Sequence, residues 1–386
     1  MAPDADMSLT AMATLVLPSN LPESLAYRAM AAEAGARLIG ASALTDDPFA
    51  DFYEDWAYLP LVGDAGFEPA LAALLRDRNV GAVFTPHVVV RQHLETALGR
   101  VAPGVALIGP LPEARRRAAT TDLARRAALG ARLCPPGPAP ADRPPLDMLE
   151  RMALLKQAHQ IEGQCSDEKI WLLCELARTA PPGDIVEIGS AWGRSAFALA
   201  WLARRYELGA VLCVDPWTGA DTHQEEAGET VRDLVAGMDI DRMFTEFRIN
   251  LMGLFPGRLN YLRLPSVRAV DRFRAVPKVA TREFGTTAYR GAISILHVDG
   301  NHDLAAVTQD LATWPKLVRP GGWVLVDDYC WPFADGPRRA GDAFLKRHWD
   351  AIDRAFVQDG VLCIQLGGPV AGAASPASSN SDGDTR

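Results

Sequence analysis

The sequence lacks the features of zinc-bound, disulfide-bonded, secreted or membrane-spanning proteins. Its six cysteines are scattered over 386 residues and form no C-x-x-C pair, which argues against zinc ribbons and dithiol redox sites. No run of about 18 apolar residues is present to span a membrane. No basic segment precedes an apolar stretch at the N-terminus, so we expect no signal peptide. We therefore expect a cytoplasmic protein with reduced cysteines.

The chain also lacks an excess of positive charge. Its net charge is −9, and its isoelectric point is near 5.4. Nucleic acids and anionic membranes attract basic surfaces, so we expect neither as a partner. With 48% hydrophobic and 23% charged residues, the composition is that of a globular protein. The length allows two domains, each with its own core.

A proline-rich segment, PPGPAPADRPP at 135–145, is the clearest domain boundary. Repeated proline favours extended backbone, which makes this segment a semi-rigid linker. It separates an N-terminal domain at 11–134 from a C-terminal domain at 146–368. The first ten residues and the small-residue tail at 369–386 offer little to bury, and we predict both to be disordered.

The N-terminal domain is predicted to be a small α/β unit. Its elements alternate in the order strand 14–20, helix 21–36, strand 37–42, helix 67–80, strand 81–86, helix 88–98 and strand 105–110. Such alternation indicates a parallel sheet with right-handed crossovers. The unit has no G-x-G-x-x-G and no Walker A sequence. By topology it resembles the small Rossmann-like domain of ATP-grasp enzymes, but no ATP-grasp domain follows, so we predict an accessory or oligomerisation domain.

The C-terminal domain contains a glycine-rich turn. An apolar strand at 184–188 runs into Glu187-x-Gly189-x-x-x-Gly193, and a helical pattern follows. Glycine lets the backbone approach a ligand, whose polar groups can meet the free N–H groups of the helix start. This spacing differs from the dinucleotide-binding fingerprint. Two later strand ends add Asp215, placed to bind ribose hydroxyls, and Ser266, which could reach an adenine edge.

Other elements are expected around this turn. We predict a helix at 146–160 and a second helix that begins after Ser166 as its N-cap. Residues 278–291 are predicted to be an exposed connector. Residues 354–366 are predicted to form a hairpin that turns at Asp359-Gly360.

Acidic residues follow two further apolar strands. ISILHVDGNHD places Asp299 after the first strand, and LVRPGGWVLVDDY places Asp327 and Asp328 after the second. Adjacent parallel strands bring their carboxyl ends together, so these acids can converge, and converging carboxylates repel unless a cation lies among them. Oxygen ligands of this kind suit Mg²⁺ or Mn²⁺. His302 is close enough along the chain to serve the same site, whereas we predict His297 to be a packed core residue.

Together these motifs resemble the class I S-adenosylmethionine-dependent methyltransferases. More narrowly, over residues 161–367, they are similar to the metal-dependent O-methyltransferase branch that includes the macrolide-sugar enzymes. The resemblance implies an α/β, Rossmann-like, mostly parallel sheet with an antiparallel C-terminal hairpin. It also implies that Asp299, Asp327 and Asp328 bind Mg²⁺ and that His302 is the general base. Catechol-type relatives have a lysine at the position of His302, so this chain departs from them.

The resemblance further implies S-adenosylmethionine as the cofactor, with Mg²⁺ or Mn²⁺ as the metal. The residues that we assign to the cofactor belong to the glycine turn and to the ends of neighbouring strands: Glu187, Gly189, Ser190, Gly193, Ser195, Asp215, Trp217 and Ser266. The long connection at 218–257 is expected to form a lid or a specificity region.

The predicted reaction is methyl transfer to a hydroxyl of a small acceptor, such as a sugar or another polyol. Two alternatives remain open. One is a metal-dependent oxygenation like that of cephalosporin hydroxylases, which would require iron and oxygen. The other is a non-catalytic S-adenosylmethionine-binding or scaffold protein. The added N-terminal domain favours a homo-oligomer, and the sequence leaves the number of subunits open.

Overall fold

The computed structural model describes residues 12–109, 112–133 and 143–370. These residues belong to two compact units, Met1–Asp122 and Leu123–Arg386, and the boundary lies inside helix α4 (Pro112–Leu133). Most of the proline-rich segment lies outside the described residues, so the domain boundary predicted there stays a prediction. The two predicted disordered tails also lie almost wholly outside the described residues. Within the described ranges, no helix is long and apolar enough to cross a membrane.

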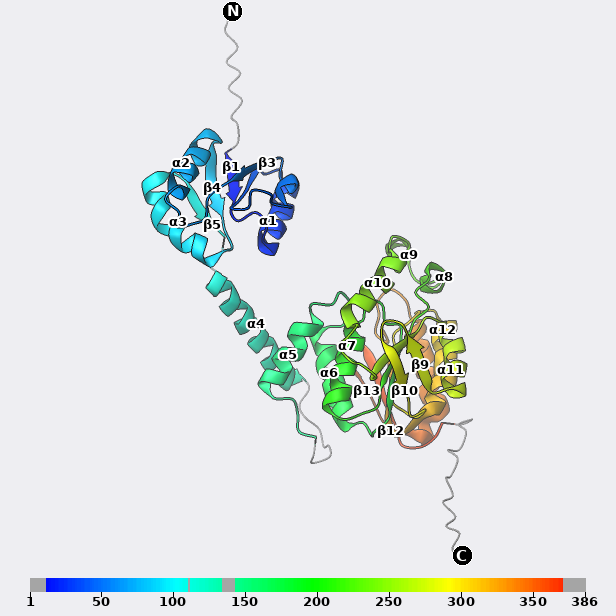
Figure 1. The fold of residues 1–386 in the computed structure, drawn as a ribbon. Coiled ribbons are helices and arrows are strands. Elements are labelled where there is room, and N and C mark those ends of the chain that lie inside the picture. The colour runs from blue at the N-terminus through cyan, green and yellow to red at the C-terminus, as the bar shows by residue number, and fades with distance from the viewer. Residues whose placement is uncertain (1–11, 110–111, 134–142, 371–386) are drawn as a thin grey trace, which may run out of the picture. The chain divides into compact units, whose positions relative to one another are not determined.

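The first unit is a five-stranded parallel sheet with the strand order β3-β2-β1-β4-β5 (Figure 1). Its elements are β1 (Ala13–Val16), α1 (Pro22–Glu33), β2 (Leu38–Ser42), β3 (Asp55–Tyr58), α2 (Phe67–Asp77), β4 (Val80–Phe84), α3 (Val88–Val101) and β5 (Ala106–Ile108). The predicted alternation of strands and helices is confirmed. Strand β3 is absent from the prediction because it has only four residues and follows a loop instead of a long helix.

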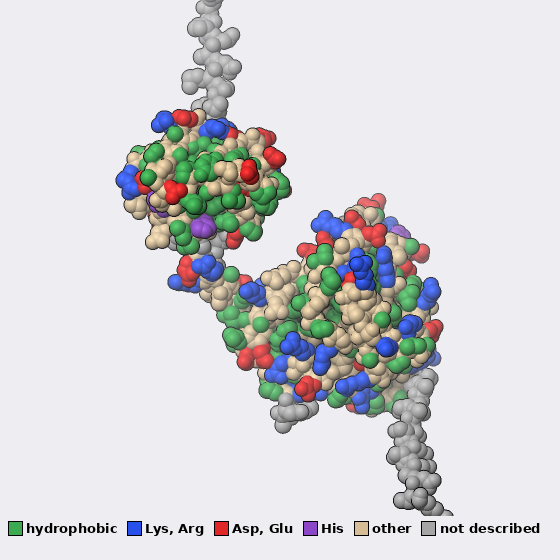
Figure 2. All heavy atoms as spheres, viewed as in Figure 1, with side chains coloured by type: hydrophobic (Ala, Val, Ile, Leu, Met, Phe, Trp, Pro, Cys, Tyr) green, Lys and Arg blue, Asp and Glu red, His purple; other side chains and the backbone are tan. Residues whose placement is uncertain are grey.

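The surface of the first unit exposes many large apolar side chains, and the face drawn in Figure 2 is largely apolar. The exposed residues include Met30, Leu44, Phe52, Tyr58, Leu61, Val88 and Val89. Contiguous exposed apolar patches often mark interaction sites. The accessory or oligomerisation role of this unit stays a prediction, for which this surface is suited.

The second unit contains a seven-stranded sheet with the order β13-β14-β12-β11-β6-β7-β8. Strands β8, β7, β6, β11 and β12 are parallel, whereas β14 pairs antiparallel with both β12 and β13. The strands are β6 (Asp184–Ile188), β7 (Val211–Val214), β8 (Leu259–Leu262), β11 (Ile293–Val298), β12 (Val318–Val326), β13 (Ile352–Gln358) and β14 (Val361–Leu366). The predicted fold class, a mostly parallel α/β sheet with an antiparallel C-terminal hairpin, is confirmed.

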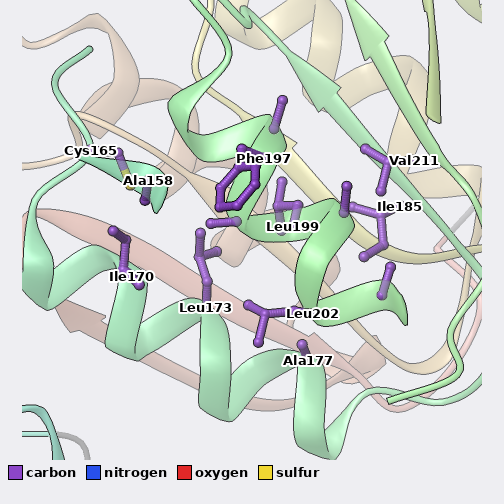
Figure 3. Close-up of a cluster of buried hydrophobic side chains, with 14 of the residues drawn as sticks. Ala158, Cys165, Ile170, Leu173, Ala177, Ile185, Phe197, Leu199, Leu202 and Val211 are labelled. Carbon is purple, nitrogen blue, oxygen red and sulfur yellow. The ribbon is translucent and has the colours of Figure 1, made fainter. Parts of the chain in front are cut away.

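The helices of the second unit cover both faces of this sheet. They are α5 (Met148–Ala158), α6 (Asp167–Thr179), α7 (Arg194–Arg205), α8 (Gly219–Thr222), α9 (Glu229–Ala236), α10 (Ile240–Leu251), α11 (Ser266–Ala275), α12 (Leu304–Thr313) and α13 (Gly336–His348). Side chains of α5, α6 and α7 pack on one face, as Figure 3 shows for Leu173, Phe197 and Ile185. Side chains of α11, α12 and α13 pack on the other face. Alternation along β6 and β11 therefore directs Glu187 and His297 toward the α6 side.

Two local predictions in this unit are confirmed. The Ser166 side chain accepts a hydrogen bond from the Lys169 N–H and caps α6. Asp359 and Gly360 connect β13 to β14 with φ values of 50° and 75°. Positive φ at both central residues is the requirement of a type I′ two-residue hairpin turn.

The connector predicted at 278–291 is exposed at about half of its positions, but it has regular secondary structure that we did not predict. These residues form an antiparallel hairpin of β9 (Lys278–Thr281) and β10 (Gly285–Ala288). The hairpin is fastened to β8 by Asn260, a fully buried residue whose Nδ2 donates to the carbonyl groups of Val279 and Gly285 at 3.2 and 3.0 Å. Polar composition indicated the exposure of part of this stretch, whereas the hydrogen bonds from the buried Asn260 amide, which hold the hairpin in place, could not be predicted from it.

Replacing Asn260 with Ala should leave the buried Val279 carbonyl and the partly buried Gly285 carbonyl without this donor. We expect the free energy of unfolding to fall by roughly 2–3 kcal/mol, the penalty for several unsatisfied buried groups. Urea denaturation of the full chain measures this. Thr286→Ala, at an exposed position of β10, is the control and should stay within about 0.5 kcal/mol of the original protein. Equal stability of the two variants would contradict this role of Asn260.

Candidate functional site

The glycine turn lies directly against the end of β11. Gly189 has a φ of 81°, and a Cβ atom added there would lie 1.9 Å from the backbone oxygen of Asp299. Gly193 has a φ of 95° and caps α7 in the left-handed conformation. A Cβ atom at Gly193 would lie 2.9 Å from Leu251 Cδ1. Both predicted glycines are therefore required by backbone conformation and by space, and the turn is brought beside Asp299.

Asp215 holds this turn in place. Its Oδ2 accepts hydrogen bonds from the Ser190 and Ala191 N–H groups at 3.0 and 3.1 Å, and its Oδ1 accepts from the Trp217 N–H at 2.8 Å. Burial raises the pKa of Asp215, and these hydrogen bonds oppose the rise. A carboxylate oxygen accepts two hydrogen bonds, so Oδ1 keeps one position for a further donor.

Two other predicted cofactor residues, Glu187 and Ser195, are buried on either side of the turn in sequence. Glu187 is fully buried, and its Oε2 accepts a hydrogen bond from the Ser190 hydroxyl at 2.7 Å. Ser195 is the second residue of α7 and is 8% exposed. Glu187 and the Ser190 side chain therefore support the turn from inside the protein.

Trp217 is a packed residue in this structure. It is 2% exposed, its ring contacts Phe244, Phe247 and Tyr261, and its Nε1 donates to the Ala191 carbonyl at 3.0 Å. Trp217 therefore supports the turn by packing, and its assignment to the cofactor stays a prediction.

Ser266 differs from its prediction in a similar way. Its hydroxyl donates to Asp310 on α12 and accepts from Trp314 Nε1 at 2.8 Å. Both partners lie inside the second unit, where Trp314 is fully buried and Asp310 is 6% exposed. The Ser266 hydroxyl already donates one hydrogen bond and accepts another, so it joins neighbouring elements of the second unit. These contacts do not support the predicted contact with adenine.

The acidic residues meet a lysine and a histidine that sequence reasoning did not assign to the site. The Lys169 ammonium on α6 contacts Asp299 Oδ2 at 2.9 Å and also pairs with Asp327 Oδ2. His297 is fully buried, with its Nδ1 3.2 Å from Glu187 Oε1 and its Nε2 3.4 Å from Asp327 Oδ2. His297 is thus buried as predicted, but it belongs to the acidic cluster and is more than a packing residue.

The charge of this cluster is set by burial and by Lys169. Burial alone would raise the pKa of Asp299, but the charge of Lys169, followed by that of His297, outweighs burial, and the pKa is lowered. Burial alone would lower the pKa of Lys169, but the charge of Asp299 and other nearby acids raises it. The cluster therefore contains a carboxylate and an ammonium, both ionised at neutral pH.

The adjacent acids Asp327 and Asp328 point to different partners. Asp328 has a φ of 53°, so the chain turns sharply after Asp327. The Asp328 Oδ2 lies 3.0 Å from His302 Nε2, and the His302 ring meets the Trp331 ring edge-on at a centroid distance of 4.6 Å. His302 Nδ1 is buried and has no hydrogen-bond partner in the described part of the chain.

The donor set fits a divalent cation. Ligand atoms lie within 4.8 Å of one another in two groups that share Asp299: His297 with Asp299 and Asp327, and Asp299 with His302 and Asp328. Carboxylate oxygens with one imidazole suit Mg²⁺ or Mn²⁺. The three predicted acids thus lie in two overlapping groups that share Asp299, with Asp327 in one group and Asp328 in the other.

The connection predicted to form a lid is tied to the loop that carries His302. The Asn301 side chain donates hydrogen bonds to the backbone carbonyl groups of Asp221 and His223. The Asp303 carboxylate accepts hydrogen bonds from the backbone N–H groups of Glu225 and Glu226. Further along, α10 packs Phe244 and Phe247 into the core. The lid prediction therefore suits residues 221–226, whereas α10 is a core helix.

Residues 186–329 match a family model described as "Methyltransferase domain". The match begins in β6, includes the glycine turn, and ends just after Asp328. No curated protein matches the chain.

Several solved structures are similar to the chain. The O-methyltransferase NovP is 17% identical, with 64% of this chain and 99% of that chain covered and a TM-score of 0.35. CalS11, a calicheamicin methyltransferase, is 14% identical, with 67% of this chain and 95% of CalS11 covered and a TM-score of 0.36. The Podospora anserina methyltransferase PaMTH1 is 16% identical, with 67% of this chain and 98% of PaMTH1 covered and a TM-score of 0.31. These scores are too low to carry an argument about the substrate of this chain.

Replacing Gly189 with Ala tests the close approach of the turn to Asp299. The added methyl group would overlap the Asp299 carbonyl, and alanine disfavours positive φ, so the free energy of unfolding should fall by at least roughly 1–3 kcal/mol. Urea denaturation measures the change. Gly219→Ala adds a methyl group with no atom within 4 Å and should be nearly neutral. Identical unfolding midpoints for the two variants would refute the assigned contact.

The Ser266–Asp310 pair predicts a pH dependence. Burial raises the pKa of Asp310 to about 6, against the hydrogen bond from Ser266. Its folded pKa lies above its unfolded value, so its contribution to stability is present below about pH 4 and is lost as the pH rises through about 6. Asp310→Asn should therefore gain about 2–3 kcal/mol relative to the original protein between about pH 4 and pH 7.5. A difference independent of pH, measured by urea denaturation, would contradict the raised pKa.

Proposed function

We propose that the chain transfers a methyl group from S-adenosylmethionine to a hydroxyl of a small acceptor, and the match of residues 186–329 to a methyltransferase-domain model supports this proposal. The observation that carries the proposal is the position of Gly189, whose Cα lies against the Asp299 backbone while the Asp299 side chain belongs to the acidic cluster. A ligand on the turn and a ligand on the cluster would therefore be neighbours.

The cofactor pocket is assigned to the glycine turn and the first turn of α7. S-adenosylmethionine, when bound, supplies an electrophilic methyl group on sulfur. Gly189 and Gly193 allow close approach of the backbone, and the N–H groups at Ser195 and nearby are free to meet a polar ligand. The free acceptor position on Asp215 Oδ1 suits a ribose hydroxyl. Glu187, Ser190 and Trp217 keep the turn in shape.

The acceptor site is assigned to the acidic cluster and the His302 loop. We assign Asp299, Asp327 and Asp328 to one Mg²⁺ or Mn²⁺, which when bound lowers the pKa of a coordinated hydroxyl and orients it. Asp328 holds the Nε2 side of His302, so the unpartnered Nδ1 is available to accept the hydroxyl proton. The acceptor oxygen forms a bond to the methyl carbon as the carbon–sulfur bond breaks.

A sugar or another polyol is the proposed acceptor. Trp331 packs edge-on against His302. Phe333, which is 55% exposed, packs against Trp331 with their ring centroids 5.3 Å apart. Aromatic faces beside a polar cluster suit a ring that has apolar C–H faces and hydroxyl edges.

The test combines a mass-spectrometric acceptor screen with one variant. Incubation with S-adenosylmethionine, Mg²⁺ and a panel of sugars and polyols should give a product heavier by one methylene equivalent. His302→Ala should lower kcat by roughly 10²–10⁴-fold, the usual contribution of a general base, with cofactor affinity unchanged. His348→Ala, on α13, is the matched control and should keep full turnover.

Removal of the metal separates the two parts of the proposal. EDTA should abolish turnover, and added Mg²⁺ or Mn²⁺ should restore it. Full turnover in EDTA would refute the metal while leaving methyl transfer in place. Failure of calorimetry to detect binding of either S-adenosylmethionine or S-adenosylhomocysteine would refute the function itself.

A further inference from the structure

Lys169 is a charged group of the acidic cluster to which the proposed reaction gives no role. It is the third residue of α6, where the Ser166 cap fixes its backbone N–H, and it is 6% exposed. Its ammonium lies between two carboxylates that end neighbouring strands, 2.9 Å from Asp299 Oδ2 and in contact with Asp327 Oδ2. A lysine is almost never buried to this degree unless it is paired.

The ammonium occupies the half of the cluster in which His297, Asp299 and Asp327 could also hold a metal ion. Their ligand atoms lie within 4.8 Å of one another. His297 Nε2 is fully buried, lies 3.7 Å from Asp299 Oδ2 and 3.4 Å from Asp327 Oδ2, and makes no hydrogen bond within the described residues. The same oxygens that Lys169 contacts would therefore be ligands of an ion in this half.

We propose that Lys169 is an internal substitute for the divalent cation. Its ammonium neutralises Asp299 and Asp327 in the metal-free protein and competes with the metal for these two carboxylates. Two buried carboxylates without a cation would repel each other, and the tethered ammonium removes that cost before any metal binds. The metal must then displace the ammonium from the shared oxygens. Lys169 thereby weakens metal binding and keeps the metal-free site folded.

This inference rests on the metal site of the proposed function but not on methyl transfer. Two roles for Lys169, competition with the metal and a purely structural one, predict different changes in metal affinity when the residue is replaced. If Lys169 competes with the metal, its removal tightens metal binding, because a like charge no longer lies beside the entering ion. If Lys169 only shapes the site, its removal leaves the affinity unchanged or weakens it.

The experiment is calorimetric titration of MnCl₂ into the full chain after dialysis against EDTA. Lys169→Met removes the charge and keeps most of the length, and we expect the dissociation constant for Mn²⁺ to fall by at least about tenfold, a modest part of the repulsion between neighbouring partly buried charges. Lys156→Met, at an exposed position on α5, makes the same change in net charge and should leave the constant unaltered. Lys169→Gln serves as a second neutral variant if the Met variant does not fold.

Thermal unfolding gives a second readout. The melting temperature of Lys169→Met without metal should lie below that of the original protein, and saturating Mn²⁺ should raise it by more than it raises the original. Mn²⁺ binding by Lys169→Met alone, with none by the original protein, would also support the proposal. Unchanged or weaker binding by a folded neutral variant would overturn it, as would no binding by any variant. S-adenosylhomocysteine titrated into the same samples reports separately on the cofactor site.

Discussion

The contact between the Gly189 backbone and the Asp299 backbone is the constraint on which the rest of the site depends. Strands β6 and β11 are neighbours, and the Asp299 N–H donates to the Ile188 carbonyl at 2.8 Å. The chain can continue from β6 into the turn only without a side chain at this position, because a Cβ atom would overlap the Asp299 carbonyl. The two halves of the site are therefore joined by backbone atoms, whose positions vary little with side-chain motion.

Electrostatics organises the region beside this contact. Glu187, His297, Asp327 and Lys169 are all buried, and each has a partner of opposite charge or hydrogen-bonding character within the cluster. Buried charges are costly unless they are paired, so the removal of one partner leaves the others exposed to the full desolvation penalty.

The sequence predicted the parts of this site that follow from strand order. Gly189, Asp215 and the acids after β11 and β12 all follow parallel strands, and the carboxyl ends of such strands lie at one edge of a sheet. The β-hairpin turn at Asp359 follows equally from local conformational preference. These features depend on short stretches of chain, which is why residue types and spacing are sufficient to predict them.

The remaining features depend on which surfaces meet in three dimensions. Lys169 belongs to a helix distant in sequence from its two acidic partners, and no spacing relates them. Ser266 and Trp217 were assigned by their position after strands, but each side chain turned toward a buried partner that the sequence does not identify. One signal was available for His297: a polar residue in an apolar strand, in register with Glu187 on the neighbouring strand.

In the proposed function, the glycine turn and the acidic cluster form one methyl-transfer site. The most direct test is the ¹³C spectrum of S-adenosylmethionine, labelled at its methyl carbon and bound to the full chain, with Mg²⁺ and then with Mn²⁺. Paramagnetic Mn²⁺ broadens the resonances of nearby nuclei, so the account predicts strong broadening of the bound methyl resonance with Mn²⁺ and a sharp resonance with Mg²⁺. A bound methyl resonance that stays sharp at saturating Mn²⁺ would contradict the account.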